Sequence, residues 1–77
     1  MDRDSTTNSA TYRAQGYDAG RAGDYAEAAR LYQLAADAYP IKTGALAKRD
    51  IDQLRGMAAS YRAGAEYKAK LAATQGE

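Results

Sequence analysis

Residues 23–40 have the sequence GDYAEAARLYQLAADAYP, in which a helix start, a packing face and a helix stop follow one another. Asp24 is a favourable N-cap residue, and Glu27 stands three positions later, where its carboxylate can accept a hydrogen bond from the Asp24 amide as in a capping box. Pro40 disfavours helical backbone at the residue before it. The stretch predicts a helix over residues 25–39 with a packing face formed by Tyr25, Ala28, Tyr32, Ala35 and Tyr39.

A helix is also expected before this stretch, over residues 10–22. Asn8 and Ser9 can cap its first free amides. Gly16 stands at one of its packing positions, and Gly20 follows one turn later. Because glycine inside a helix costs on the order of 1 kcal/mol relative to alanine, these two positions predict that a neighbouring helix lies close to this one.

The longest predicted helix covers residues 45–73, after a connection over residues 41–44 in which Thr43 is a candidate cap. Its packing positions keep a four-three spacing and are Ala47, Ile51, Leu54, Ala58, Tyr61, Ala65 and Ala72. Lys68 occupies the one position of this series that carries a charge, and the pattern gives no reason for it.

The composition favours an all-α fold. The chain has 19 alanines and no valine, phenylalanine or tryptophan. Alanine is the best helix former, whereas strands prefer β-branched and aromatic residues. Since two short connections make consecutive helices antiparallel, we expect an antiparallel three-helix bundle over residues 9–74, a disordered arm at residues 1–8 and a frayed end at residues 75–77.

The residue types that catalysis and metal binding use most are missing. Without cysteine or histidine the chain has no disulfide, no thiolate or imidazole metal ligand and no imidazole base. Asp50 and Asp52 lie two positions apart, on different faces of a helix, and Ser60 has no histidine to activate it. The sequence therefore predicts a protein that is not an enzyme and that uses no cofactor, metal or small-molecule substrate.

The charge and hydropathy of the chain exclude a strong electrostatic or membrane signal. The net charge is +1, too small to indicate nucleic-acid or membrane binding by itself. The opening residues lack the apolar core of a signal peptide, and no segment approaches the ~18 consecutive apolar residues of a membrane span. We expect a cytoplasmic protein that does not insert into membranes.

Two family resemblances rest on the same stretch. About residues 10–72 resemble the microtubule-interacting-and-trafficking (MIT) domain. The resemblance rests on residues 24–33 and on residues 61–66 of the last helix. MIT domains carry a sequence signature on their last helix. Tyr61, Ala65 and Glu66 match this signature, whereas Gly64 stands where the family usually has arginine. Helices one and two also resemble a single tetratricopeptide repeat. The MIT resemblance implies a free-standing three-helix bundle.

That resemblance also implies a binding function. In MIT domains an amphipathic helix or an extended segment of an ESCRT-type filament protein docks in a groove between two of the three helices. We therefore expect this chain to bind a protein or peptide, helical in form, with apolar pockets for its anchors and charges at the rim. The residues expected to line the groove, between helices two and three, are Ala29, Gln33, Ala36, Arg55, Ala59, Arg62 and Glu66.

Two alternatives stay open. A thin core of alanine and tyrosine favours a self-assembling structural or adaptor protein completed by another copy, and Tyr17 and Tyr67 lie off the packing stripes where such a contact could form. A small nucleic-acid-binding protein is the second alternative, because Lys48, Arg55 and Arg62 share one side of the last helix. The sequence leaves the oligomeric state undecided.

Overall fold

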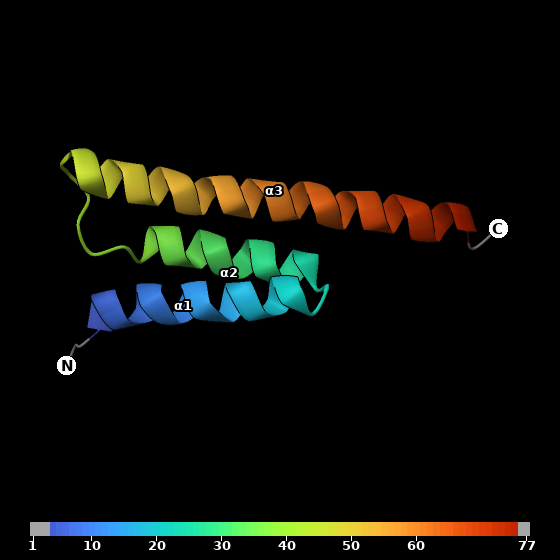
Figure 1. Cartoon of the computed structure of the whole chain (residues 1–77), viewed down its shortest axis with the longest axis horizontal. Coiled ribbons are helices and arrows are strands. Elements are labelled where there is room, and N and C mark those ends of the chain that lie inside the picture. The colour runs from blue at the N-terminus through green and yellow to red at the C-terminus, as the bar shows by residue number, and fades with distance from the viewer. Residues whose placement is uncertain (1–3, 76–77) are drawn as a thin grey trace.

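The computed structural model describes residues 4–75, and this part of the chain forms three helices. They are α1 (Asp4–Arg21), α2 (Tyr25–Asp37) and α3 (Ala45–Gln75). α2 lies between α1 and α3 and packs against both, so that the helices form a layer measuring 50 × 25 × 15 Å (Figure 1). The predicted all-α fold of three consecutive packed helices is confirmed.

The helix boundaries differ from the expected ones mainly at the N-terminus. α1 begins at Asp4, ahead of residue 10, so the part of the expected arm from residue 4 to residue 8 is helical. α2 ends at Asp37, and α3 continues to Gln75. Residues 1–3 and 76–77 lie outside the described residues, where the arm and the frayed end stay predictions.

The corner between α1 and α2 confirms one half of the predicted capping box. Asp24 is the N-cap of α2, and its carboxylate accepts a hydrogen bond from the Glu27 amide at 3.4 Å. The reciprocal bond was a wrong expectation, since the Asp24 amide donates to the carbonyl of Ala19 at 2.9 Å. The Glu27 carboxylate instead accepts two bonds from Arg30, at 2.9 and 2.6 Å, which lower the pKa of Glu27.

The central position of α2 explains the extent of its buried surface. A helix that packs on one side buries a single stripe, whereas α2 is covered from two sides. Its buried residues therefore include positions beside the predicted stripe. The buried apolar side chains are Ala28, Ala29, Leu31, Tyr32, Ala35 and Ala36 on α2 and Ala47, Ile51, Leu54 and Ala58 on α3.

Tyr61 of α3 holds the centre of the layer together. Its ring stacks on Tyr32 with a centroid distance of 5.6 Å and an interplanar angle of 3°, and it meets Tyr25 at 5.7 Å in a tilted arrangement. Such aromatic pairs contribute about 0.5–1.5 kcal/mol beyond the area that they bury. The end of the Tyr61 side chain reaches across α2 to Gly20 of α1.

The two glycines of α1 leave room for these rings. A Cβ atom at Gly20 would stand 2.6 Å from Cζ of Tyr61, and one at Gly16 would stand 3.0 Å from the Tyr32 ring. Both distances are shorter than ordinary carbon contacts. The expectation that a neighbouring helix lies close to Gly16 and Gly20 is therefore confirmed, with tyrosine rings as the neighbouring atoms.

Ser9 connects α1 to α2 rather than capping a helix. The residue lies inside α1 and is buried, and its hydroxyl donates to the carbonyl oxygen of Ala35 at 2.8 Å. A buried hydroxyl needs such a partner, because leaving it unpaired costs about 1–3 kcal/mol.

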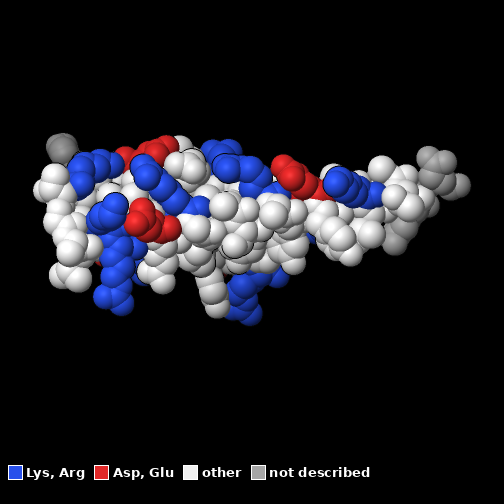
Figure 2. Space-filling view, turned by 90° about the horizontal axis from the view of Figure 1, so that it is seen from above, with Lys and Arg blue, Asp and Glu red and all other residues white. Residues whose placement is uncertain are grey.

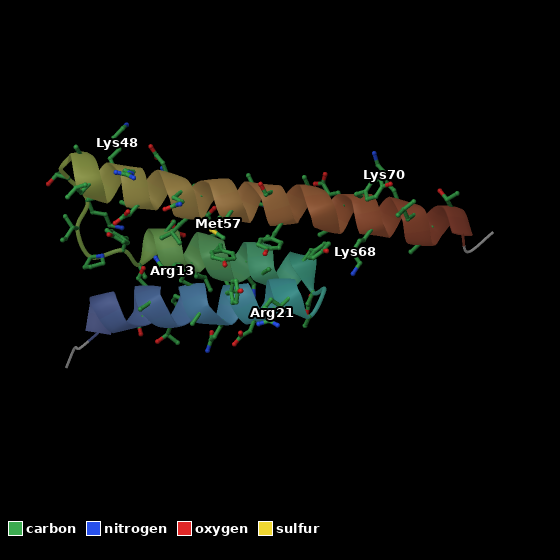
Figure 3. All side chains as sticks on the ribbon, in the orientation of Figure 1. Arg13, Arg21, Lys48, Met57, Lys68 and Lys70 are labelled. Carbon is green, nitrogen blue, oxygen red and sulfur yellow. The ribbon has the colours of Figure 1, made fainter. Side chains whose placement is uncertain are left out.

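The contacts of Lys68 at the α1–α2 corner explain why a charged residue stands at this packing position of α3. Its ammonium group donates to the carbonyl oxygen of Gly23 at 2.7 Å and lies 4.9 Å from the centroid of the Tyr25 ring. Gly23 has a φ of 87°, and its carbonyl lies where the chain leaves α1 for α2. A cation at this packing position thus links the far half of α3 to the α1–α2 corner (Figure 3).

Gly20→Ala is expected to destabilise the protein, although alanine is the better helix former. The added methyl group overlaps the Tyr61 ring, and overpacking of this kind costs about 1–3 kcal/mol. Gly56→Ala is the matched control, because a Cβ there meets nothing within 4 Å, and it should raise the free energy of unfolding by about 1 kcal/mol. Thermal denaturation followed by circular dichroism measures both. A shift of the same sign in the two variants contradicts the packing.

Lys68→Gln should lower the free energy of unfolding by about 0.5–1 kcal/mol, because a charge-assisted hydrogen bond and a cation–π contact at an exposed site are lost. Lys70→Gln is the control, since Lys70 points away from the corner (Figure 3). Urea denaturation of the two variants compares them directly. Equal stability of both would show that the Lys68 contact contributes nothing.

Candidate functional site

A groove with a volume of about 840 Å³ lies between α1 and α3. α1 and α3 form its walls, and Tyr32 of α2 lies on its floor. Tyr39, Pro40 and Ile41 of the α2–α3 connection border the end of the groove that lies away from the α1–α2 corner. We call it the α1–α3 groove, and it is lined by Ser9, Ala10, Arg13, Ala14, Tyr17, Asp18, Tyr32, Tyr39, Pro40, Ile41, Asp50, Gln53, Leu54 and Met57.

The groove exists because α1 and α3 pack on α2 rather than fully on each other. Tyr61 spans the distance to Gly20 near the α1–α2 corner and closes the groove at that end. Toward the α2–α3 connection nothing comparable bridges the two walls, and Arg13 of α1 and Met57 of α3 both point over α2 there (Figure 3). The groove is therefore narrow at the corner and open at the other end.

The surface of the groove combines apolar side chains with a few charges. Tyr17 and Ile41 are both more than half exposed, and Met57 is half-buried. Arg13 and Asp18 stand on the α1 wall, and the Arg21 guanidinium lies 5.9 Å from the Tyr17 ring centroid. Apolar area with charges of both signs beside it suits a protein segment better than a nucleic acid.

One hydrogen bond fixes the open end of the groove. The Tyr39 hydroxyl donates to the Asp50 carboxylate at 2.5 Å and so joins the end of α2 to α3. This bond raises the pKa of Tyr39, with smaller contributions in the same direction from desolvation and from the Asp50 charge. Burial also raises the pKa of Tyr32, which lies on the groove floor.

The residues predicted to line a groove between helices two and three differ in their burial. Ala29 and Ala36 belong to the buried core, with exposures of 4% and 1%. Gln33 is half-buried, and its amide donates to Asp37 at 3.1 Å. The members of the set that lie on α3 are exposed, namely Arg55, Ala59, Arg62 and Glu66.

Two members of that set meet at a smaller hollow beside the α2–α3 connection. Ala36 and Arg55 line it, and its volume is about 670 Å³. Its other lining side chains include Lys42 and Asp52, and the Lys42 ammonium donates to the carbonyl oxygen of Asp37 at 2.8 Å. The hollow is richer in charge and poorer in apolar side chains than the α1–α3 groove.

The charged residues of α3 do not form a patch of one sign on the face drawn in Figure 2. Lys and Arg side chains alternate there with Asp and Glu along the length of the molecule (Figure 2). A phosphate backbone is bound best by a continuous row of positive charge. This distribution gives little support to nucleic-acid binding.

Residues 4–75 contain no group of three or more acidic, histidine or cysteine side chains arranged to hold a metal ion. None of the helices in that range has both the length and the hydropathy needed to cross a membrane.

No family model, curated protein or solved structure matches this chain. The fold is thus established as three consecutive packed helices, while neither the MIT domain nor the tetratricopeptide repeat is identified as its family.

Stability should fall as the pH rises above the ordinary tyrosine pKa of about 10. Because the folded-state pKa of Tyr39 is raised, the contribution of its bond to Asp50 is fully present below pH 10 and is lost as the pH passes through the raised value. The difference in unfolding free energy between the wild type and Tyr39→Phe should therefore shrink from pH 8 to pH 11. Asp50→Ala, which removes the acceptor, should behave like Tyr39→Phe, and a difference that is constant with pH contradicts the bond.

Proposed function

We propose that this chain is a non-enzymatic interaction module that binds a helical segment of a protein in the α1–α3 groove. The observation that carries the proposal is the open groove itself, which has tyrosine rings at its floor and exposed apolar side chains along its sides. Exposed apolar surface of this kind, with polar residues around it, is typical of protein-binding sites.

The lining of the groove suits a helix. A helix placed here would contact residues of α1, α2 and α3. Ala10 and Ala14 on the α1 wall allow a close approach, and Met57 opposite them is a side chain that adapts to different partners. Helix-in-groove binding uses anchors three or four positions apart, which would fill the spaces beside Tyr17 and Ile41.

The charges at the rim would orient the bound segment. Arg13 and Asp18 lie five residues apart on α1, and Asp50 stands on the opposite wall. A helix with acidic and basic residues at matching positions would bind in one direction only. Affinity would come from the buried apolar anchors, and direction from these charges.

The MIT resemblance supplies one partner class for this proposal, an ESCRT-type filament protein. It also supplies a second candidate site, the predicted groove between α2 and α3. The hollow that contains Ala36 and Arg55 favours that site, although its lining is mostly polar. The two sites lie on different sides of α2 and can be separated by experiment.

Photocrosslinking tests the proposal. A photoreactive benzoylphenylalanine replaces Tyr17 in one variant and Arg62 in another, and both variants are irradiated in cells of the native host. Both positions are exposed, so neither replacement disturbs the core. We expect protein adducts from position 17 and few from position 62, because only position 17 lies in the α1–α3 groove.

The competing outcomes are distinct. Adducts from position 62 alone would move the binding site to the α2–α3 side. Protein adducts from neither position, with both variants folded, would contradict a protein-binding function. Crosslinks to nucleic acid from position 62 would favour the nucleic-acid alternative.

A further inference from the structure

We infer that the helical segment bound in the α1–α3 groove carries an aspartate or glutamate whose carboxylate binds between Arg13 and the Tyr32 hydroxyl. The inference rests on the proposed function, because it names the chemistry that the same groove selects in its partner. Its evidence is a pair of groups on the groove lining, a buried hydroxyl and an exposed cation, and both are donors without a partner in the chain itself.

The Tyr32 hydroxyl is a buried polar group that has no hydrogen-bond partner among residues 8–74, whose side chains the structure describes. Tyr32 is 1% exposed, and none of the side-chain hydrogen bonds in that range involves it. The Ser9 and Tyr39 hydroxyls, in contrast, both donate to an acceptor within the chain. Because an unpaired buried hydroxyl costs free energy, this one calls for an acceptor that comes from outside.

The surroundings of the Tyr32 hydroxyl connect it to Arg13. The Tyr32 ring stacks on Tyr61, and Gly16 of α1 lies against its Cδ2 and Cε2 atoms. Burial raises the pKa of the hydroxyl most, Tyr61 raises it further, and the Arg13 charge lowers it. The guanidinium group is therefore near enough to act on this hydroxyl, and both residues line the α1–α3 groove.

Arg13 is the cation that the groove presents to a partner. Its side chain is exposed and points over α2 (Figure 3). Among the side chains of residues 8–74, the ion pair joins Arg30 to Glu27, and no acid lies within ion-pair distance of Arg13. A guanidinium group has five N–H donors and no acceptor. Arg13 thus requires acceptors, as the Tyr32 hydroxyl does.

A carboxylate satisfies both groups at once. Its two oxygens accept hydrogen bonds from the guanidinium group of Arg13 and from the Tyr32 hydroxyl, and each of these bonds is charge-assisted. An ammonium group in the same place would be repelled by Arg13, and an apolar side chain would leave both donors unpaired. A helix that covers the groove excludes water from these bonds and so strengthens them.

The two acids of the groove confine the carboxylate to this one position. Asp50 stands on the α3 wall, where its own carboxylate accepts a bond from Tyr39. Asp18 comes five residues after Arg13, so it is turned about 140° away from Arg13 around α1. Both acids repel negative charge elsewhere along the groove. The partner is therefore a segment with one well-placed acid and not a uniformly acidic one.

The apolar lining on either side of Arg13 adds a spacing to this requirement. Tyr17 lies one helical turn from Arg13 toward the α1–α2 corner, and Ile41 lies at the open end of the groove. Both are more than half exposed. A helix presents side chains to the same groove every three or four residues. The bound segment should have an apolar residue three or four positions before its acid and another three or four positions after it.

Selection from a phage-displayed peptide library tests the charge. The library encodes amphipathic helices with fixed apolar positions and randomised polar positions. The wild type should enrich peptides with an aspartate or glutamate between two apolar anchors, and Arg13→Glu should enrich lysine or arginine at that place. Arg62→Glu changes the net charge by the same amount at an exposed residue outside the groove, so it should select the same peptides as the wild type.

Tyr32→Phe tests the hydroxyl, because it keeps the ring that stacks on Tyr61. The variant should be at least as stable as the wild type to heat, since it lacks a buried unpaired group. It should bind the enriched acidic peptide about tenfold more weakly in fluorescence anisotropy, since one bond to a charged group is lost. Tyr67→Phe, at an exposed tyrosine outside the groove, is the control and should bind as the wild type does. Equal affinity of Tyr32→Phe and the wild type would overturn the inference.

The results separate this inference from the proposed function. Enriched peptides without a preference for aspartate or glutamate, which crosslink to a photoreactive group at position 17, would overturn the inference and leave the groove function in place. An acidic preference that persists in Arg13→Glu would also overturn it, since the acid would bind elsewhere. A folded wild type that enriches no peptide and captures no protein at position 17 would overturn both.

Discussion

The contact of Tyr61 with both of the other helices determines the geometry of the whole molecule. Its ring stacks on Tyr32 of α2, and its hydroxyl end reaches Gly20 of α1. The missing side chain at Gly20 sets how near α1 comes to α3 at the corner, and hence where the groove between them closes. The shape of the candidate site is thus a consequence of core packing at one end of the layer.

A core of this composition makes that contact important for stability. The buried positions are mostly alanine, which contributes little apolar area per residue. Tyr32, with 1% exposure, is the largest fully buried side chain among the described residues. A small domain buries a modest fraction of its surface, so the contacts of Tyr61 with Tyr32 and Tyr25 matter for holding α3 against α2.

Much of the fold followed from the sequence because its signals are local. The Asp24 N-cap, the Pro40 stop and the tyrosines at heptad spacing each depend on residues within two turns of one another. The glycines of α1 also predicted a close neighbour correctly. Tertiary contacts were less accessible, since nothing near Glu27 in sequence distinguishes a bond to its own cap from a bond to Arg30, and nothing near Lys68 indicates the Gly23 carbonyl 45 residues away.

The candidate site was harder to predict for the same reason. The buried stripes predict which faces of the helices are covered. They do not predict that α2 lies between the other two helices, or that a groove is left over Tyr32. Tyr17 stood out as a residue off the stripes, whereas Ile41 and Met57 gave no signal.

Nuclear Overhauser effects between the Tyr61 ring and Gly20 test the central claim most directly, because they report the position of α1 relative to α3 without a mutation. The account predicts strong cross-peaks from the Tyr61 ring protons to the Gly20 α-protons and to the Tyr32 ring. Tyr61 cross-peaks to Tyr32 without any to Gly20 would place α1 elsewhere on α2, and the groove as described would not exist.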